Sequence, residues 1–375
     1  MESCPINPSI AFTKIKTLAV AAIFLGVFQL VRCKSGAKKI PPPIPTIPTT
    51  SIRLQGRDNR YVSYYGNGIY TYKNKYDFTG SIRLDKTNLY GRTPSYRNLP
   101  QWSLGLGWSL DKESFFNVDN FDRLRLRASY GWNGHIDKSA SPYINGTPWV
   151  DAVNQTQYAA VLTTPNPGLT WEKTKTYNIG ADFSMFGQRL QGEIELYNKQ
   201  SEDVLTDIAV NPTYGFYYDE ATLNAGDISN KGVEFDISGL IIDKEIKWNS
   251  LLNFSYNKNE VQNVKSTSAN IASRTSLSQF YPVAGQPVDF LAVAEWTGYS
   301  ENGLPQVYLD GEITEVSDIS YSGVDVDKLF KFVGQRSPKT FGSWTNNVSY
   351  KNFELSARFL YSFGNKFLKD SPPRN

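Results

Sequence analysis

Charged side chains recur at every second residue in several stretches of this chain. Glu193 and Glu195 form one such pair, and Arg123, Arg125 and Arg127 form a basic row. Alternate residues of a β-strand share a face and lie about 7 Å apart, a spacing that a glycoside hydrolase could use for two carboxylates. The signal is weak, because any polar strand face produces it. The arginine row could guide an anionic or polyhydroxyl solute, but we favour a generic water-lined wall.

Nucleophiles and metal ligands are scarce in the sequence. The two cysteines, Cys4 and Cys33, lie near the start of the chain, and His135 is the single histidine. The rest of the chain therefore offers no disulfide and no thiolate or histidine-cluster metal site, and a lone histidine in a loop is most often solvated. No G-x-S-x-G, P-loop, H-E-x-x-H or C-x-x-C pattern occurs. We therefore predict no catalytic residue, no cofactor and no enzymatic activity.

An acidic group falls in a long predicted loop and consists of Glu315, Asp318, Asp325 and Asp327. Carboxylate oxygens are ligands for Ca²⁺, but the group lacks the regular D-x-D-x-D-G spacing of a calcium loop. We favour a solvated acidic loop and predict no metal site. The net charge of +3 is too balanced to indicate a nucleic-acid partner.

The elements that must hold these side chains are β-strands. In the clearest stretch, residues 101–110, one face carries Trp102, Leu104, Leu106, Trp108 and Leu110, and the other carries Ser103, Gly105, Gly107 and Ser109. This period of two predicts a strand that is apolar on one side. The mean hydropathy of −0.41 excludes a bundle of membrane helices. It does not exclude a membrane barrel, in which only every second residue is apolar.

Ten long strands follow from this pattern. They are residues 61–72, 76–86, 101–110, 121–133, 175–184, 189–199, 231–240, 246–257, 339–350 and 353–363. Most are as long as a tilted strand that crosses a bilayer, about 9–11 residues, whereas soluble strands average about 5–6.

The connections between these strands alternate between short turns and long excursions. The long ones are residues 87–100, 134–174, 200–230 and 258–338. Short turns on one rim and long loops on the other are typical of outer-membrane barrels. The alternation requires that 258–338 be a single excursion, with a hairpin-like pair near 290–296 and 306–309 inside it. A soluble β-sandwich or solenoid is the alternative, but strand length and loop alternation favour an antiparallel transmembrane barrel with long extracellular loops.

The two faces of the predicted strands differ in chemistry. The expected lipid-facing residues are Phe78, Ile82, Leu84, Trp102, Leu104, Leu126, Tyr130, Ile179, Phe183, Leu190, Ile194, Val233, Phe235, Leu252, Phe254, Phe359 and Tyr361. Aromatic residues near strand ends that suit headgroup belts are Trp132, Trp248, Tyr256 and Phe353. The opposite face carries Asp77, Arg83, Asp85, Arg123, Arg125, Arg127, Asp182, Glu193, Glu195, Glu234, Asp236, Asn249 and Asn253. These charges would need many partners in a sandwich core but cost little in a wet lumen, which favours a barrel.

The start of the chain has the composition of an export leader. Lys14 and Lys16 precede the apolar run 17–31, whose 15 residues match a signal-peptide core better than a spanning helix. We assign 1–33 to a signal peptide or N-terminal anchor, 34–51 to a proline-rich linker and 52–375 to the barrel region. The stretch before Cys33 weakly resembles a lipoprotein acceptor, but Arg32 stands where a small residue is expected, so lipidation is not predicted.

Several segments resemble the SusC/RagA-like class of TonB-dependent outer-membrane transporters. They are NPGLTWEKTKTYNIGADFSMFGQRLQGEIELYNK (166–199), NAGDISNKGVEFDISG (224–239), LRLRASYGWNGH (124–135), SYKNFELSARFLYSFGNKF (349–367) and YDFTGSIRLDKTNLYG (76–91). The resemblance covers about residues 52–367. It implies an outer-membrane location and import of glycan or peptide fragments. It also implies coupling to the TonB complex and a SusD-like lipoprotein lid as partner.

The sequence also departs from that family. We find no plug domain or TonB-contact segment before the predicted strands and no closing strand with a terminal aromatic residue. Such barrels resemble plugged transporters with about 22 strands, so about nine strands would be missing before and three after. We therefore expect a partial barrel that is not transport-competent alone, because lipid cannot satisfy two unpaired sheet edges. Closure into a small ten-stranded barrel, or pairing with another fragment, would rescue it.

Two other functions remain open at this point: a surface-exposed β-rich binding or adhesion protein, and a secreted soluble β-sheet enzyme. The substrate cannot be assigned, because aromatic loop residues suit sugar stacking and ordinary loop packing alike. These residues are Tyr214, Phe216, Tyr217, Tyr218 and Trp296.

Overall fold

The computed structural model describes residues 31–34, 60–88, 98–135, 137, 140–209, 220–265, 282–319 and 326–367. Apart from residues 31–34, the predicted leader 1–33 and linker 34–51 lie outside the described residues. No helix in the described part of the chain is long and apolar enough to cross a membrane.

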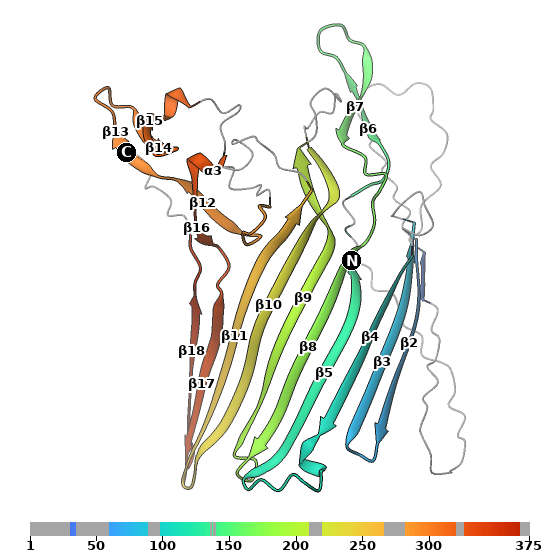
Figure 1. The fold of residues 1–375 in the computed structure, drawn as a ribbon, viewed down its shortest axis with the longest axis vertical. Helices are drawn as coiled ribbons and strands as arrows, with labels where there is room; N and C mark the ends of the chain where they lie inside the picture. Colours follow the sequence, from blue (N-terminus) through green and yellow to red (C-terminus); the bar gives the residue numbers. More distant parts are fainter. Residues whose placement is uncertain are drawn as a thin grey trace.

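The main sheet is antiparallel throughout and follows chain order. Its strands are β1 (Val31–Lys34), β2 (Arg60–Tyr72), β3 (Tyr76–Thr87), β4 (Asn98–Ser109), β5 (Phe121–His135), β8 (Glu172–Met185), β9 (Leu190–Ala209), β10 (Glu220–Asp243), β11 (Ile246–Val264), β17 (Thr340–Tyr350) and β18 (Phe353–Phe363). The ten predicted strands are confirmed, and the short β1 adds one at the edge. Figure 1 shows them side by side, with the short turns at one end and the long excursions at the other.

Several strands are longer than predicted, most of all β9, β10 and β11, the last of which runs to Val264 instead of ending at Asn257. The stretch 200–230 was predicted to be a loop, but β9 continues to Ala209 and β10 already begins at Glu220. Pairing between Ala221 and Ile208 carries the ladder beyond the predicted ends. The stretch is rich in Asp, Asn and Gly, which indicate a turn locally. Cross-strand pairing overrides that preference, and the register of the pairing shifts on both sides of Gly226.

The long excursions form small sheets of their own. They are β6 (Asn145–Val150) with β7 (Gln157–Thr163), β12 (Phe290–Ala294) with β16 (Phe330–Gln335), and β13 (Trp296–Tyr299), β14 (Pro305–Leu309) and β15 (Glu312–Glu315) together. The short helices are η1 (Leu110–Lys112), η3 (Val316–Asp318) and α3 (Val326–Leu329). Because β17 pairs with β11, residues 258–338 are one excursion, as predicted. The predicted hairpin is wrong in detail, since β12 pairs with β16 and β14 pairs with β13 and β15.

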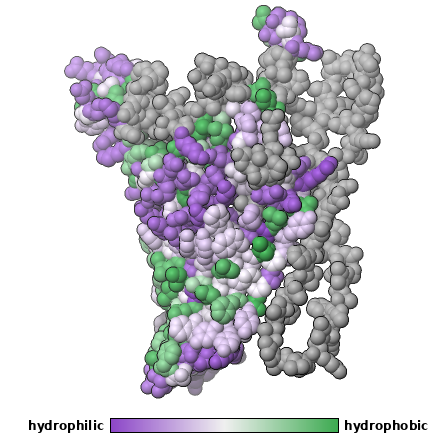
Figure 2. Space-filling model, turned by 45° about the vertical axis from the view of Figure 1, so that its right-hand side comes forward, coloured by the Kyte–Doolittle hydropathy of each residue, from purple (hydrophilic) through white to green (hydrophobic). Residues whose placement is uncertain are grey.

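The main sheet is a single layer without a second layer packed on it in the described residues. The buried apolar residues of that part all lie toward the long-excursion end, and they are Leu169, Trp171, Ala221, Ala225, Val261, Phe290, Leu291, Val307, Ile319 and Leu329. Along the strands, large apolar side chains stay exposed, with Ile82 at 60% and Ile179 at 62%. In Figure 2, hydrophobic patches (green) lie on the lower part of the strands, with hydrophilic residues (purple) above them and again at the bottom tip. A sheet face that exposes so many large apolar side chains is unusual for a soluble monomer.

Candidate functional site: the polar face of the sheet

Strand register brings charged residues of β5, β8, β9 and β10 into two neighbouring rows. In one row, Arg127 of β5 lies beside Gly180 of β8, which lies beside Glu195 of β9 and then Glu234 of β10. The next row contains Arg125, Asp182, Glu193 and Asp236 in the same strand order. We call Asp77, Arg125, Arg127, Asp182, Glu193 and Glu195 the wall cluster. All six were predicted to share the polar face, and the register confirms it.

Arg125 crosses a strand to reach its partner. Its Nη2 donates to Oδ2 of Asp77 on β3 at 2.7 Å, passing over Gly107 of β4. A Cβ at position 107 would lie 2.9 Å from that Nη2, so the glycine makes room for the guanidinium. The hydroxyl of Thr71 donates to the other oxygen of Asp77 at 2.7 Å. Both carboxylate oxygens of Asp77 are therefore bound.

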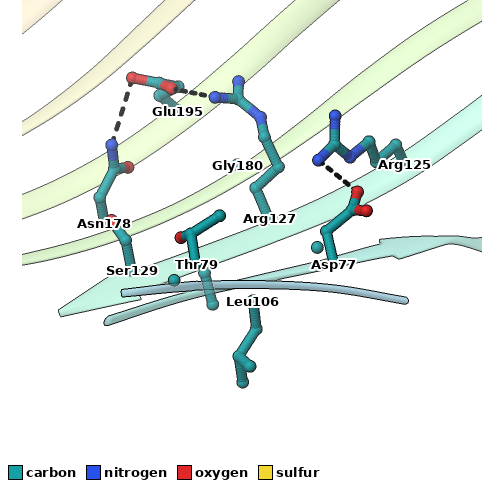
Figure 3. Close-up of a pocket in the computed structure, with 12 residues that line it drawn as sticks. Asp77, Thr79, Leu106, Arg125, Arg127, Ser129, Asn178, Gly180 and Glu195 are labelled. Atoms are coloured by element: carbon teal, nitrogen blue, oxygen red, sulfur yellow. Dashed lines mark hydrogen bonds and ion pairs between the residues drawn. The ribbon is translucent and has the colours of Figure 1, made fainter. Parts of the chain in front are cut away.

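Arg127 pairs with three carboxylates at once, and Figure 3 shows the contact with one of them, Glu195. Its guanidinium nitrogens lie 2.8 Å from Asp182, 3.0 Å from Glu195 and 3.3 Å from Glu193. Gly180 lies beneath it, where a Cβ would be 3.3 Å from Nη2. The side chain is only 33% exposed, so the guanidinium is held close to the sheet. One cation thus organises acidic groups from two neighbouring strands.

Negative charge is in surplus beside Arg127. Glu234 lies directly opposite Glu195, and Asp236 lies opposite Glu193, so like charges face each other across the ladder. Such pairs are destabilising unless water or a cation compensates them. The Glu193 side chain is 50% exposed. These carboxylates suit a face that contacts water and would be costly inside an apolar core.

Glu193 and Glu195 do not have the geometry of a glycoside hydrolase pair. Both point to the same Arg127 guanidinium along one wall instead of facing each other across a substrate. A hollow of about 190 Å³ opens beside Glu195 and is lined by polar groups that include Thr79, Ser129 and Asn178. Asn178 donates to Glu195 at 3.4 Å, and the buried Oδ1 of the same amide accepts no hydrogen bond. This surface can bind or guide a polar solute by hydrogen bonding.

Arg123 adjoins the wall cluster, since it lines a second polar hollow of about 510 Å³ together with Asp77 and Arg125. His135 ends β5 and is exposed. Of the acidic group, Glu315 ends β15, Asp318 ends η3 and Asp327 falls in α3, whereas Asp325 lies outside the described residues. No group of three metal-ligating residues forms in the described part. Tyr214, Phe216, Tyr217 and Tyr218 also lie outside it. Trp296 is 62% exposed and meets the Tyr299 ring edge-on at 5.7 Å, so both sugar stacking and loop packing stay open for it.

Sequence reasoning missed a hydrogen-bonded hub where the strands meet the long loops. The Asn224 amide donates to the carbonyls of Thr170 and Asp203 at 3.0 and 2.8 Å and accepts from the Thr170 N–H at 3.1 Å. Asn166 donates to the same Asn224 oxygen at 3.4 Å. The neighbouring Leu169 is fully buried. The only sequence signal was that Asn166 and Asn224 begin two of the family-like segments.

Comparison with known proteins gives one consistent result. Residues 32–359 match the family model described as TonB dependent receptor-like, beta-barrel. TonB-dependent receptor P26 of Formosa agariphila is 28% identical over 326 residues, covering 81% of this chain and 32% of that protein. TonB-dependent receptor SusC of Bacteroides thetaiotaomicron is 27% identical over 333 residues, covering 82% and 31%. The chain therefore spans about a third of the length of these relatives.

A solved structure described as the RagAB peptide transporter has the same fold over this region. It superposes with a TM-score of 0.68 at 21% identity, covering 83% of this chain and 34% of that one.

Proposed function

Because the chain belongs to the TonB-dependent receptor β-barrel family, we propose that it forms part of the wall of a SusC-type importer that carries nutrients across the outer membrane. The family match covers the β-strands and the wall cluster. The chain spans only about a third of the length of these relatives. Nutrient import by the whole protein is therefore inferred from the relatives.

The observation that carries the proposal is the contrast between the two faces of a single-layer sheet. Leu104 points to a face where large apolar side chains are exposed, and Arg127 points to a face of partly exposed charges. Each strand of the wall from β2 to β18 is at least 11 residues long, enough to cross a bilayer when tilted. Lipid on the first face and water on the second would satisfy both.

The arrangement of the connections gives the proposed orientation. The short turns would lie on the periplasmic side, and the excursions that carry β6–β7 and β12–β16 would lie outside the cell. The wall cluster would then line the water-filled route of the solute. A glycan or a peptide would find hydrogen-bonding groups there, and a SusD-like lipoprotein and the TonB complex are the partners that the relatives suggest.

The sheet is open in the described residues, with β1 at one end of the strand order and β18 at the other. Unpaired strand edges are costly in lipid. We propose that further strands, from this polypeptide or from a second one, complete the barrel. The chain, with its barrel region at 52–375, would then not transport by itself. Residues 1–33 would be a signal peptide or an N-terminal anchor, and 34–51 would act as a spacer. Energy-coupled uptake by liposomes that hold only this chain would contradict this part.

The two faces can be tested with neighbouring residues. Ser103 and Leu104 are both exposed in the fold but lie on opposite faces of β4. In a background with Cys4 and Cys33 replaced by serine, Ser103→Cys and Leu104→Cys would be treated in isolated outer membranes with a water-soluble maleimide. We expect only Ser103→Cys to react, and both to react after denaturation. Equal reaction of both in a soluble fraction would support a secreted β-sheet protein instead.

A further inference from the structure

Two carboxylates on the polar face of β10 form no ion pair with another described residue. They are Glu234, which lies opposite Glu195 of β9, and Asp236, which lies opposite Glu193. The side-chain amide of Asn253 donates to Asp236, but an amide carries no charge. Negative charge therefore accumulates along β9 and β10.

The nearby cations do not remove this surplus. Arg125 is paired with Asp77, and Arg127 is shared among three carboxylates. Arg123, the remaining guanidinium of the row on β5, forms no ion pair with another described residue. Lys199 and Arg358 share this face but lie two rows and three strands away.

The balance of charge on this part of the face is negative. Two guanidiniums, those of Arg123 and Arg127, face five carboxylates, which belong to Asp182, Glu193, Glu195, Glu234 and Asp236. Three negative charges are thus in surplus. The chain as a whole carries a net charge of +3, so the surplus is a local property of the wall.

A hollow of about 310 Å³ lies within this charged area. The charged side chains that line it are Arg123, Asp182, Glu193 and Asp236. Ser184 also lines it, and its side chain is only 9% exposed. The Ser184 hydroxyl has no hydrogen-bond partner among the described residues, although register places it on the same face as Asp182. An unbonded buried hydroxyl is costly, and a donor that enters the hollow would satisfy it.

An organic cation suits this hollow better than a metal ion. The lining carboxylates are distributed over β8, β9 and β10, and no group of three metal-ligating side chains converges in the described part of the chain. A guanidinium or an alkylammonium group donates several N–H bonds in different directions. Such a group can contact Glu193 and Asp236 together while the Ser184 hydroxyl accepts a further bond.

We propose that this hollow, which we call the cation site, binds the guanidinium or ammonium group of a carried solute. The wall then favours basic peptides or amino sugars over acidic solutes. The inference rests on the proposed function, because it requires the polar face to line the route of a solute. Arg123 lines the same hollow, so its charge opposes the ligand and limits the affinity.

The test measures binding to the full chain in micelles of a non-ionic detergent. Triarginine carrying a neutral fluorescent label is titrated with the protein and followed by anisotropy, and labelled triglutamate is the comparison. We expect triarginine to bind at least about tenfold more tightly. Unlabelled glucosamine trimer and its N-acetylated form are then added as competitors. Displacement by the amino form alone shows that the site accepts amino sugars, and no displacement by either restricts it to basic peptides.

Four variants locate the binding. Asp236→Asn should weaken binding of triarginine about fivefold, because it removes one ion pair. Ser184→Ala should weaken it without a change of charge, and Arg123→Gln should strengthen it by removing the opposing cation. A gain in affinity cannot come from misfolding. Asp243→Asn is the matched control, since it makes the same charge change at an exposed position at the end of β10 and should leave binding unchanged.

Equal affinity for triarginine and triglutamate would overturn the cation site, and so would equal effects of Asp236→Asn and Asp243→Asn. Weaker binding by Arg123→Gln would also overturn it. The maleimide experiment at Ser103 and Leu104 separates this failure from that of the proposed function. If the labelling contrast holds while selective binding is absent, the cation site is wrong and the proposed function stands. If the contrast is lost, both are wrong.

Discussion

Replacing Arg127 with methionine tests whether one guanidinium organises the wall cluster. Methionine keeps most of the apolar stem but removes contacts to Asp182, Glu195 and Glu193 at 2.8, 3.0 and 3.3 Å. The three carboxylates would then face one another without a cation. We therefore expect Arg127→Met to lower the free energy of unfolding.

The expected size follows from exposure. Arg127 is 33% exposed and its three partners range from 22% to 50%, so solvent screens each pair substantially. Ion pairs of this kind contribute about 0.2–1 kcal/mol each, which gives about 1–2 kcal/mol for the three together. At about 1 M salt the screening length falls to roughly 3 Å, and the difference from the parent protein should shrink.

The assay is urea unfolding of the protein in detergent micelles, at low and at high salt. Arg83→Met is the matched control, because Arg83 contacts Asp85 alone and is 56% exposed, so its loss should cost well under about 1 kcal/mol. If Arg127→Met costs no more than Arg83→Met, or if salt does not reduce its effect, the three-carboxylate argument is wrong.

Three further predictions concern the hub, the glycines and the turn of residues 110–120 between β4 and β5, which we call the foot and in which the Glu113 carboxylate accepts hydrogen bonds from Tyr76, Lys75 and Trp108. Asn224→Ala should lose about 2–3 kcal/mol of local stability, because it removes three well-formed hydrogen bonds, and hydrogen exchange at Thr170 should accelerate; unchanged exchange would contradict the hub. Because the pKa of Glu113 is lowered from 4.5 to about 2, its bonds should stabilise the foot fully above pH 4.5 and be lost as pH falls through about 2. Probe mobility on the foot should follow that window, and Glu113→Gln should abolish it. Gly180→Val should cost about 1–3 kcal/mol in urea unfolding because its Cβ meets a carbonyl at 3.2 Å, whereas Gly66→Val, with open space around it, should cost far less.

The alternation of side chains predicted most of the wall because strand geometry is local. A period of two assigns Trp102 and Ser103 to opposite faces whatever their partners are, and the register confirms both assignments. The continuation of β9 and β10 could not be predicted in this way. Its residues prefer turns, and they form strands because residues apart in the sequence, such as Ile208 and Ala221, pair across the two strands.

The hub and the foot escaped sequence analysis for a related reason. Asn224 looks like any loop asparagine until Thr170, more than fifty residues away, supplies both a donor and an acceptor to it. Glu113 likewise becomes a fixed anchor only because Lys75 and Tyr76 of another hairpin reach it. Polar side chains acquire such roles through distant partners, and strand periodicity carries no information about them.

The ion pairs that cross glycines of the polar face could have been predicted if the strand register had been known. Gly180 separates Arg127 from Glu195 in one row, and a guanidinium can span the intervening strand only where no side chain stands in its way. Gly107 gives Arg125 the same freedom on its diagonal path to Asp77. On the polar face of this wall, a strand glycine therefore leaves room for a long side chain from the neighbouring strand to cross above it. The Gly180→Val experiment tests this directly, because a valine side chain there would stand between Arg127 and Glu195.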